Sequence, residues 1–163
     1  MKAALVLAAA LALVACARPQ TAETKAANCA AAEGGALRVE KAWVRAQADA
    51  SSMSAAYFTL CNAGMTPVTI EGLSTPAAGL VELHETTRDS NGVVSMAPTG
   101  PITLAPGEAV AFEPGGKHAM LMSLAEPIAE GVTVSLTLEL ADGSTIETTA
   151  EAKSVADAAA HDH

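Results

Sequence analysis

The residues whose chemistry stands out in this sequence are two histidines and two methionines: His84, Met96, His118 and Met120. His118 and Met120 are two positions apart in a segment that alternates like a β-strand, so their side chains should share one face. His84 lies out of phase with the apolar residues of its own segment, which predicts that it points away from the core. An Asn91-Gly92 turn should bring Met96 back beside that segment.

Two imidazoles and two thioethers form a soft, neutral donor set, and Cu(I) is the biological ion that suits it best. Thioether sulfur needs no deprotonation and forms no disulfide, so it remains a donor in an oxidising compartment, although oxidation to the sulfoxide is a hazard. We therefore predict one Cu(I) per chain at these four residues. Met122 continues the face of His118 and Met120 and is a candidate auxiliary ligand.

A single methionine on a strand is usually core filler, so the interpretation depends on elements that gather the four residues. Short alternating segments separated by turn residues are expected at residues 37–44, 55–61, 68–73, 81–87, 93–96, 102–104, 110–113, 118–124, 132–140 and 145–150. Asn91-Gly92 and Asp142-Gly143 predict two-residue hairpin turns. The pattern predicts an all-β domain over residues 37–150, an antiparallel β-sandwich or barrel, without a helix.

The first 17 residues are expected to be a signal peptide, because Lys2 precedes an uncharged apolar run too short to span a bilayer. Residues 13–16 resemble a lipobox, which would make Cys16 the lipidated N-terminus, and ordinary cleavage near Cys16 is the alternative. Either mode places the mature protein in the periplasm. Residues 18–36 read as a flexible lead-in and residues 151–163 as a flexible tail.

Cys29 and Cys61 remain once Cys16 is assigned to the leader. A disulfide is favoured in an oxidising compartment, and free thiols or metal ligation are the alternatives. Closing that loop would stabilise the fold by roughly 3–4 kcal/mol.

The chain has 163 residues and a formal net charge of −9, with a pI near 4.8. This acidity argues against nucleic acid and against docking on anionic lipid, so membrane contact is expected only through a lipid anchor. No serine or cysteine nucleophile sits in a recognisable motif, so we expect a binding protein and not an enzyme.

The order of the four residues resembles the pattern H(M)x10Mx21HxM of the periplasmic copper chaperone family PCuAC. Residues 85–95 separate His84 from Met96, and residues 97–117 separate Met96 from His118. The resemblance extends to residues 42–46 and 56–60, and covers about 37–149. One position departs from the pattern, because Glu85 replaces the optional second methionine.

The resemblance implies a cupredoxin-like β-sandwich that binds Cu(I) near one end. It also implies copper delivery to the dinuclear copper site of cytochrome c oxidase, directly or through a thioredoxin-like assembly factor. Some family members carry a C-terminal extension that binds Cu(II). His161 and His163 could form a shortened version of it, since histidine nitrogen suits Cu(II), and the alternative is that they are the solvated end of the tail.

Two other functions compete with the copper chaperone. A structural lipoprotein of the cell envelope would carry these histidines and methionines incidentally. An electron-transfer cupredoxin needs a cysteine thiolate beside two histidines, and the segment carrying His118 and Met120 has no cysteine.

Overall fold

The computed structural model describes residue 29 and residues 37–160. The expected signal peptide with Cys16, most of the lead-in, and His161 and His163 lie outside these residues. The strands are β1 Leu37–Arg45, β2 Ser54–Asn62, β3 Val68–Ser74, β4 Ala78–Arg88, β5 Val94–Pro98, β6 Ile102–Leu104, β7 Ala109–Phe112, β8 Lys117–Leu124, β9 Thr133–Leu140 and β10 Thr145–Lys153. The predicted all-β class is confirmed, with each expected strand present within a few residues of its predicted bounds.

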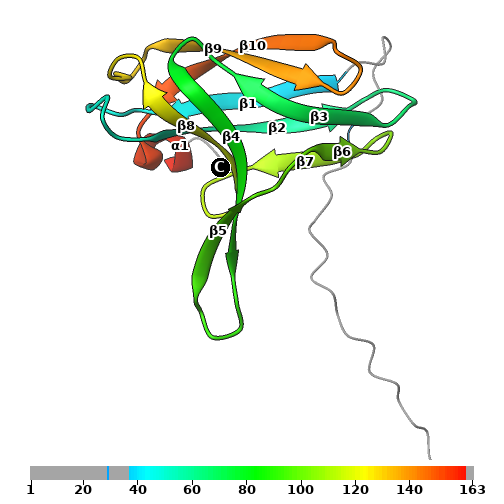
Figure 1. The fold of residues 1–163 in the computed structure, drawn as a ribbon, viewed down its shortest axis with the longest axis horizontal. Helices are drawn as coiled ribbons and strands as arrows, with labels where there is room; N and C mark the ends of the chain where they lie inside the picture. The colour runs from blue at the N-terminus through cyan, green and yellow to red at the C-terminus, as the bar shows by residue number, and fades with distance from the viewer. Residues whose placement is uncertain (1–28, 30–36, 161–163) are drawn as a thin grey trace, which may run out of the picture.

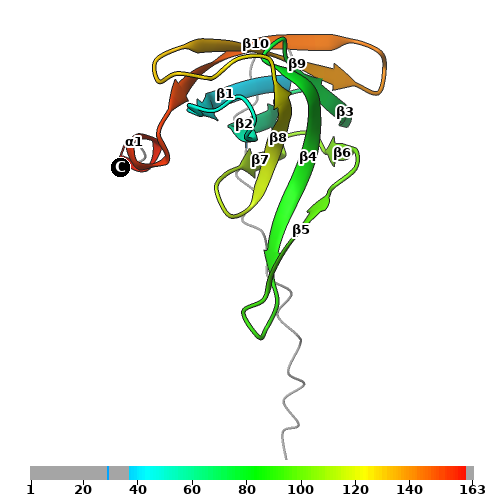
Figure 2. The same ribbon diagram turned by 60° about the vertical axis from the view of Figure 1, so that its left-hand side comes forward.

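Within the described part, the strands form one hydrogen-bonded sheet in the order β5-β4-β8-β7-β2-β1-β10-β9-β3-β6, and β8 also pairs with β2. The pairings are antiparallel except for β1 with β10 and β7 with β8. The sheet folds over so that one face encloses the core, while the β4–β5 hairpin projects away from the body (Figures 1 and 2).

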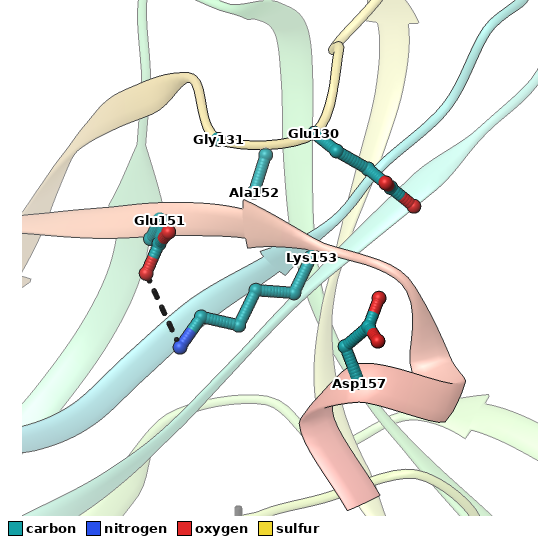
Figure 3. Close-up of a pocket in the computed structure, with 6 residues that line it drawn as sticks. All are labelled: Glu130, Gly131, Glu151, Ala152, Lys153 and Asp157. Carbon is teal, nitrogen blue, oxygen red and sulfur yellow. Dashed lines mark ion pairs between the residues drawn. The ribbon is translucent and has the colours of Figure 1, made fainter. Parts of the chain in front are cut away.

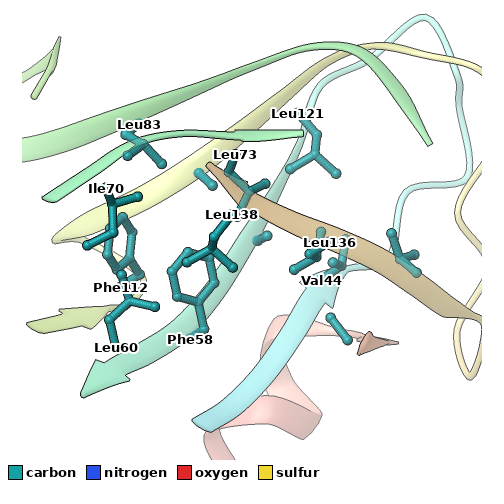
Figure 4. Packing of buried hydrophobic residues seen from close by; sticks show 14 of the residues in the cluster. Val44, Phe58, Leu60, Ile70, Leu73, Leu83, Phe112, Leu121, Leu136 and Leu138 are labelled. Carbon is teal, nitrogen blue, oxygen red and sulfur yellow. The ribbon is translucent and has the colours of Figure 1, made fainter. Parts of the chain in front are cut away.

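The core is mainly aliphatic because the chain has few aromatic residues. Alternation along β9 turns Val134, Leu136 and Leu138 inward, where they meet side chains from the opposite layer such as Leu121 and Phe58 (Figure 4). Val132 was expected to extend this row, but it lies outside the strand and is 46% exposed.

Both predicted hairpin turns occur, but each is longer than two residues. In the β4–β5 hairpin, the Asp89 N–H donates to the Val93 carbonyl, and the Gly92 N–H donates back to the Asp89 carbonyl. Gly92 has a φ of 83°, which makes this a three-residue loop with a glycine in the left-handed region. The Asp89 carboxylate accepts the Asn91 and Val93 N–H groups and so stabilises the longer loop.

The domain continues beyond its predicted end at residue 150. β10 runs to Lys153, because its last residues pair with β1, for example Arg45 with Lys153. A short helix, α1 Val155–Ala160, follows, and the Ser154 hydroxyl and Asp157 cap its first turn. Residues 151–160, which the sequence assigned to a flexible tail, are thus the end of a strand and a short helix in the structure.

Candidate metal-binding site

The four predicted ligands lie on one face of the three adjacent strands β5, β4 and β8. His84 pairs directly with His118, and Glu82 pairs with Met120. On the other side of β4, Thr86 pairs with Met96. Because directly paired residues share a face, and residues two apart along a strand do too, the register puts both histidines and both methionines on the same surface.

The two imidazoles form the centre of this arrangement. Their ring centroids are 6.0 Å apart, and the rings are tilted by 56°. His118 is 5% exposed and the His84 side chain 13% exposed, so the pair is more buried than a surface site would be. The opposite faces of the same strands carry Leu83 and Leu121 into the core, which fixes the register.

The hydrogen bonds of the two rings assign their protons. The Nδ1 atom of His118 lies 3.1 Å from the Gly116 carbonyl oxygen, which can only accept, so Nδ1 carries the hydrogen and Nε2 keeps its lone pair. The Nε2 atom of His84 lies 3.0 Å from Oε2 of Glu82, so there Nε2 carries the hydrogen. The lone pair of a neutral His84 is then on Nδ1, which is buried and has no hydrogen-bond partner in the described structure.

An unpartnered buried acceptor is costly, roughly 1–3 kcal/mol, unless something binds it. A metal ion on His84 Nδ1 would satisfy this atom. The donor set on this face therefore fits a soft cation, since neutral nitrogen and thioether sulfur are the donors that remain free once the Glu82 carboxylate is bonded to His84 Nε2.

The two methionines are not equivalent. Met120 follows His118 on β8 and is partly buried between Glu82 of β4 and Ala55 of β2. Met96 is 51% exposed on the projecting strand β5. In a flat sheet the Cα atoms of Met96 and Met120 would be roughly 16 Å apart, from a rise of about 3.3 Å per residue and a strand spacing of about 4.8 Å. By the same estimate the Cα atoms of Met96 and Met120 are equally far from that of His84, but Met96 is one strand farther from His118 and is more exposed. The structure thus brings His84, His118 and Met120 together and leaves Met96 at the edge of the site on the same face.

Met122 lies farther along the same face. It pairs with Leu80, four residue pairs along from the His84–His118 pair, which in a regular strand is roughly 13 Å from His118. The structure therefore does not bring Met122 beside the histidines.

Residues 42–46 and 56–60 meet on the paired strands β1 and β2. Trp43 stacks on Tyr57 with ring centroids 4.4 Å apart, and Tyr57 is two residues from Ala55, which pairs with Met120. Burial raises the pKa of the Tyr57 phenol above 10.0, and the positive charge of Arg45 opposes this shift.

Cys29 and Cys61 are joined by a disulfide, with Cα atoms 5.6 Å apart. Of the three alternatives left by the sequence, the structure has the bonded pair. Neither of these two cysteines offers a thiolate to the histidines, as an electron-transfer cupredoxin would need.

A hollow elsewhere among the described residues lacks the donors for a soft metal. A hollow of about 230 Å³ near the end of β10 is lined by residues such as Glu130, Asp157 and the Lys153–Glu151 ion pair (Figure 3). Over residues 37–160 and Cys29, no three His, Cys, Asp or Glu side chains cluster as a metal site.

Glu82 and Gly116 were not singled out from the sequence. Glu82 could have been found, because it lies two residues before His84 and so shares its face. The Gly116 carbonyl could not, because its position depends on the turn between β7 and β8.

The family model described as "Putative lipoprotein LpqE-like" matches residues 37–152. The chain belongs to this LpqE-like family. One relative, "Putative lipoprotein Lxx21020" from Leifsonia xyli subsp. xyli, is 34% identical over 109 residues, which cover 67% of this chain. The match spans 64% of that relative's length.

Solved structures similar to this LpqE-like chain are PCuAC domains and a copper protein. The copper-bound PCuAC domain from PmoF2 has a TM-score of 0.61 at 21% identity, covering 74% of this chain and 94% of that one. The solution structure of CuI-DR1885 from Deinococcus radiodurans has a TM-score of 0.55 at 34% identity, covering 77% and 85%. The expected cupredoxin-like fold is confirmed, and the resemblance to PCuAC is supported by these neighbours.

The described residues contain no helix long and apolar enough to cross a membrane.

Proposed function

We propose that this protein is an extracytoplasmic Cu(I)-binding metallochaperone. The observation that carries the proposal is the register that sets His84 against His118, with Met120 beside them on one face. Both imidazoles have one nitrogen held by a hydrogen bond and one lone pair left for a metal. Such orientation of metal-binding histidines by an outer hydrogen bond is a recurring feature of metal sites.

The ligand set favours Cu(I) over harder ions. The donors are neutral nitrogen and thioether sulfur, whereas Mg²⁺ and Ca²⁺ require oxygen donors. The similarity to CuI-DR1885 at 34% identity supports the same choice, since that solution structure is of the Cu(I) form of the protein. We propose one Cu(I) per chain.

The exposure of Met96 suits copper transfer and not permanent storage. An acceptor protein can approach the outlying thioether on β5 while His84, His118 and Met120 still hold the ion. Copper would then leave by stepwise ligand exchange, without catalysis of a covalent reaction.

The recipient and location are finer parts of the proposal. The PCuAC resemblance supports delivery to the dinuclear copper site of cytochrome c oxidase or to a thioredoxin-like assembly factor. The lipoprotein names of the family and relative support an envelope location, with Cys16 as the lipidated residue. His161 and His163 would provide a second, weaker site for Cu(II).

Anaerobic competition between the mature protein and a chromogenic Cu(I) chelator tests the copper site. We expect one equivalent of tightly bound Cu(I), and a loss of affinity of at least 10-fold in His118→Ala and in Met120→Leu. Met65→Leu is a matched control, because Met65 is a thioether that is 93% exposed in the β2–β3 connection. An unchanged affinity in the His118→Ala, Met120→Leu double variant contradicts the proposed site and favours the structural lipoprotein.

A deletion strain tests the transfer role. Loss of the chaperone should lower cytochrome c oxidase activity under copper limitation, and added copper should restore it. Normal oxidase activity in the deletion strain under copper limitation argues against the proposed recipient.

A further inference from the structure

Glu82 is a charged residue that lies at the proposed site but is not one of the proposed ligands. It lies on β4 two residues before His84, on the same face, and it pairs with Met120 across to β8. Its Oε2 atom is 3.0 Å from His84 Nε2, and its side chain is 45% exposed. The carboxylate therefore reaches one nitrogen of a proposed ligand while remaining accessible to water.

This contact decides which nitrogen of His84 can bind a metal. An ionised carboxylate only accepts hydrogen bonds, so Nε2 must donate and Nδ1 must carry the lone pair of the neutral ring. Nδ1 is the buried atom without a hydrogen-bond partner in the described structure. His118 is arranged the opposite way, because its Nδ1 donates to the Gly116 carbonyl and leaves Nε2 as the donor to a metal.

We propose that Glu82 is a positioning residue that directs His84 to bind Cu(I) through Nδ1, while His118 binds through Nε2. This inference rests on the proposed Cu(I) site. A carboxylate on the far nitrogen fixes the ring orientation and makes the imidazole a stronger donor, as in the carboxylate–histidine–metal arrangements of other proteins. The histidine pair is thus asymmetric, with a carboxylate behind one ring and a peptide carbonyl behind the other.

Two other roles for Glu82 predict different outcomes from the positioning role. If Glu82 were itself a ligand, its oxygen would converge with both imidazoles, but no such three-residue cluster occurs among the described residues. If Glu82 occupied the place of the copper ion, then His84 would bind through Nε2, and removing the carboxylate would tighten Cu(I) binding.

Cu(I) affinity of three variants separates these roles. Glu82→Ala should weaken Cu(I) binding about 10-fold or more, the usual effect of losing an outer partner of a metal-binding histidine. Glu82→Gln should regain much of that loss, because its amide oxygen still accepts from Nε2, whereas an amide would not replace a ligating carboxylate. Glu85→Ala is the matched control, since it removes the same charge one residue from His84 but on the other face, where Glu85 pairs with Lys117. We expect that control to stay within 2-fold of the wild type.

Nitrogen-15 NMR of the imidazoles gives a second readout that does not depend on affinity. In the copper-free protein in mildly alkaline buffer, His84 should be protonated on Nε2 and His118 on Nδ1, and Glu82→Ala should disturb only the His84 pattern. Since Cu(I) is diamagnetic, the loaded protein should show the metal on Nδ1 of His84. Coordination through Nε2, or a Glu82→Ala affinity equal to or tighter than that of Glu85→Ala, overturns the inference. Failure of the wild-type protein to bind Cu(I) overturns the proposed function instead, and the copper-free spectra still report on the Glu82 contact.

Discussion

His84 on β4 and His118 on β8 are paired residue against residue, and the hydrogen bonds of their rings leave a lone pair on Nδ1 of one and on Nε2 of the other. The relationship is a property of strand register. Leu83 and Ala119, the neighbours of the two histidines, are paired on the opposite face and buried in the core. A slip of one residue would turn the imidazoles toward the core and the core residues away from it, so the packing of the sandwich maintains the site.

The first prediction concerns coupling between the two histidines. His84→Ala and His118→Ala should each lower Cu(I) affinity by at least 10-fold, and the double variant should lose less than the sum of the two free-energy losses. The reason is that one imidazole with a single thioether is already a poor site, so little remains to be lost. A double-mutant cycle from Cu(I) competition titrations measures the coupling. Strict additivity would indicate that the two rings bind separate ions.

A second prediction separates the two thioethers. Met120→Leu should lower Cu(I) affinity more than Met96→Leu, because Met120 adjoins the histidine pair whereas Met96 lies on the exposed strand β5. Leucine preserves the volume of methionine, so folding should change little. Equilibrium titration and the rate of Cu(I) release to a chelator are the measurements. Equal losses of affinity would show that the β4–β5 hairpin bends toward the two histidines and that both thioethers bind Cu(I) with the same strength.

The strands that carry the ligands could be predicted from the sequence because alternation and turn residues report local structure. The face of His84 followed from its phase against Leu83, and the Asn91-Gly92 turn correctly joined β4 to β5. The burial of the His118 side chain could not be predicted, because it depends on neighbouring strands and on the turn at Gly116. The separation of Met96 from Met120 also escaped prediction, since sequence spacing does not say which residues of paired strands are opposite each other. Residues 151–153 look like a polar tail in sequence, and only their pairing with β1 makes them a strand.

A third prediction concerns a buried residue that holds the fold away from the site. Asn62 is fully buried at the end of β2, where Nδ2 donates to the carbonyls of Thr66, Leu104 and Ala105, and Oδ1 accepts the Gly64 N–H. Asn62→Ala leaves these groups without their partner and should lower the free energy of unfolding by roughly 2–4 kcal/mol. Chemical denaturation measures the change. Cu(I) affinity under native conditions should stay close to that of the wild type, and a large loss there would mean that Asn62 also shapes the site.

A fourth prediction concerns the disulfide. Cys29 and Cys61 are 32 residues apart, so removing the bond should lower the free energy of unfolding by roughly 3–4 kcal/mol in the chain-entropy estimate. The Cys29→Ser, Cys61→Ser variant should nevertheless bind one Cu(I) with nearly unchanged affinity, because no cysteine belongs to the ligand set. Denaturation and Cu(I) titration of the same preparation test both statements. Loss of Cu(I) binding together with retained stability would instead indicate thiolate ligation.

The donor atoms around copper can be observed directly by X-ray absorption at the copper edge of the Cu(I)-loaded mature protein. The account predicts a mixed shell of imidazole nitrogen and thioether sulfur, with a clear loss of the sulfur contribution in Met120→Leu and loss of imidazole scattering in His118→Ala. A shell without sulfur, or a spectrum that neither variant changes, would contradict a copper site built from His84, His118 and Met120.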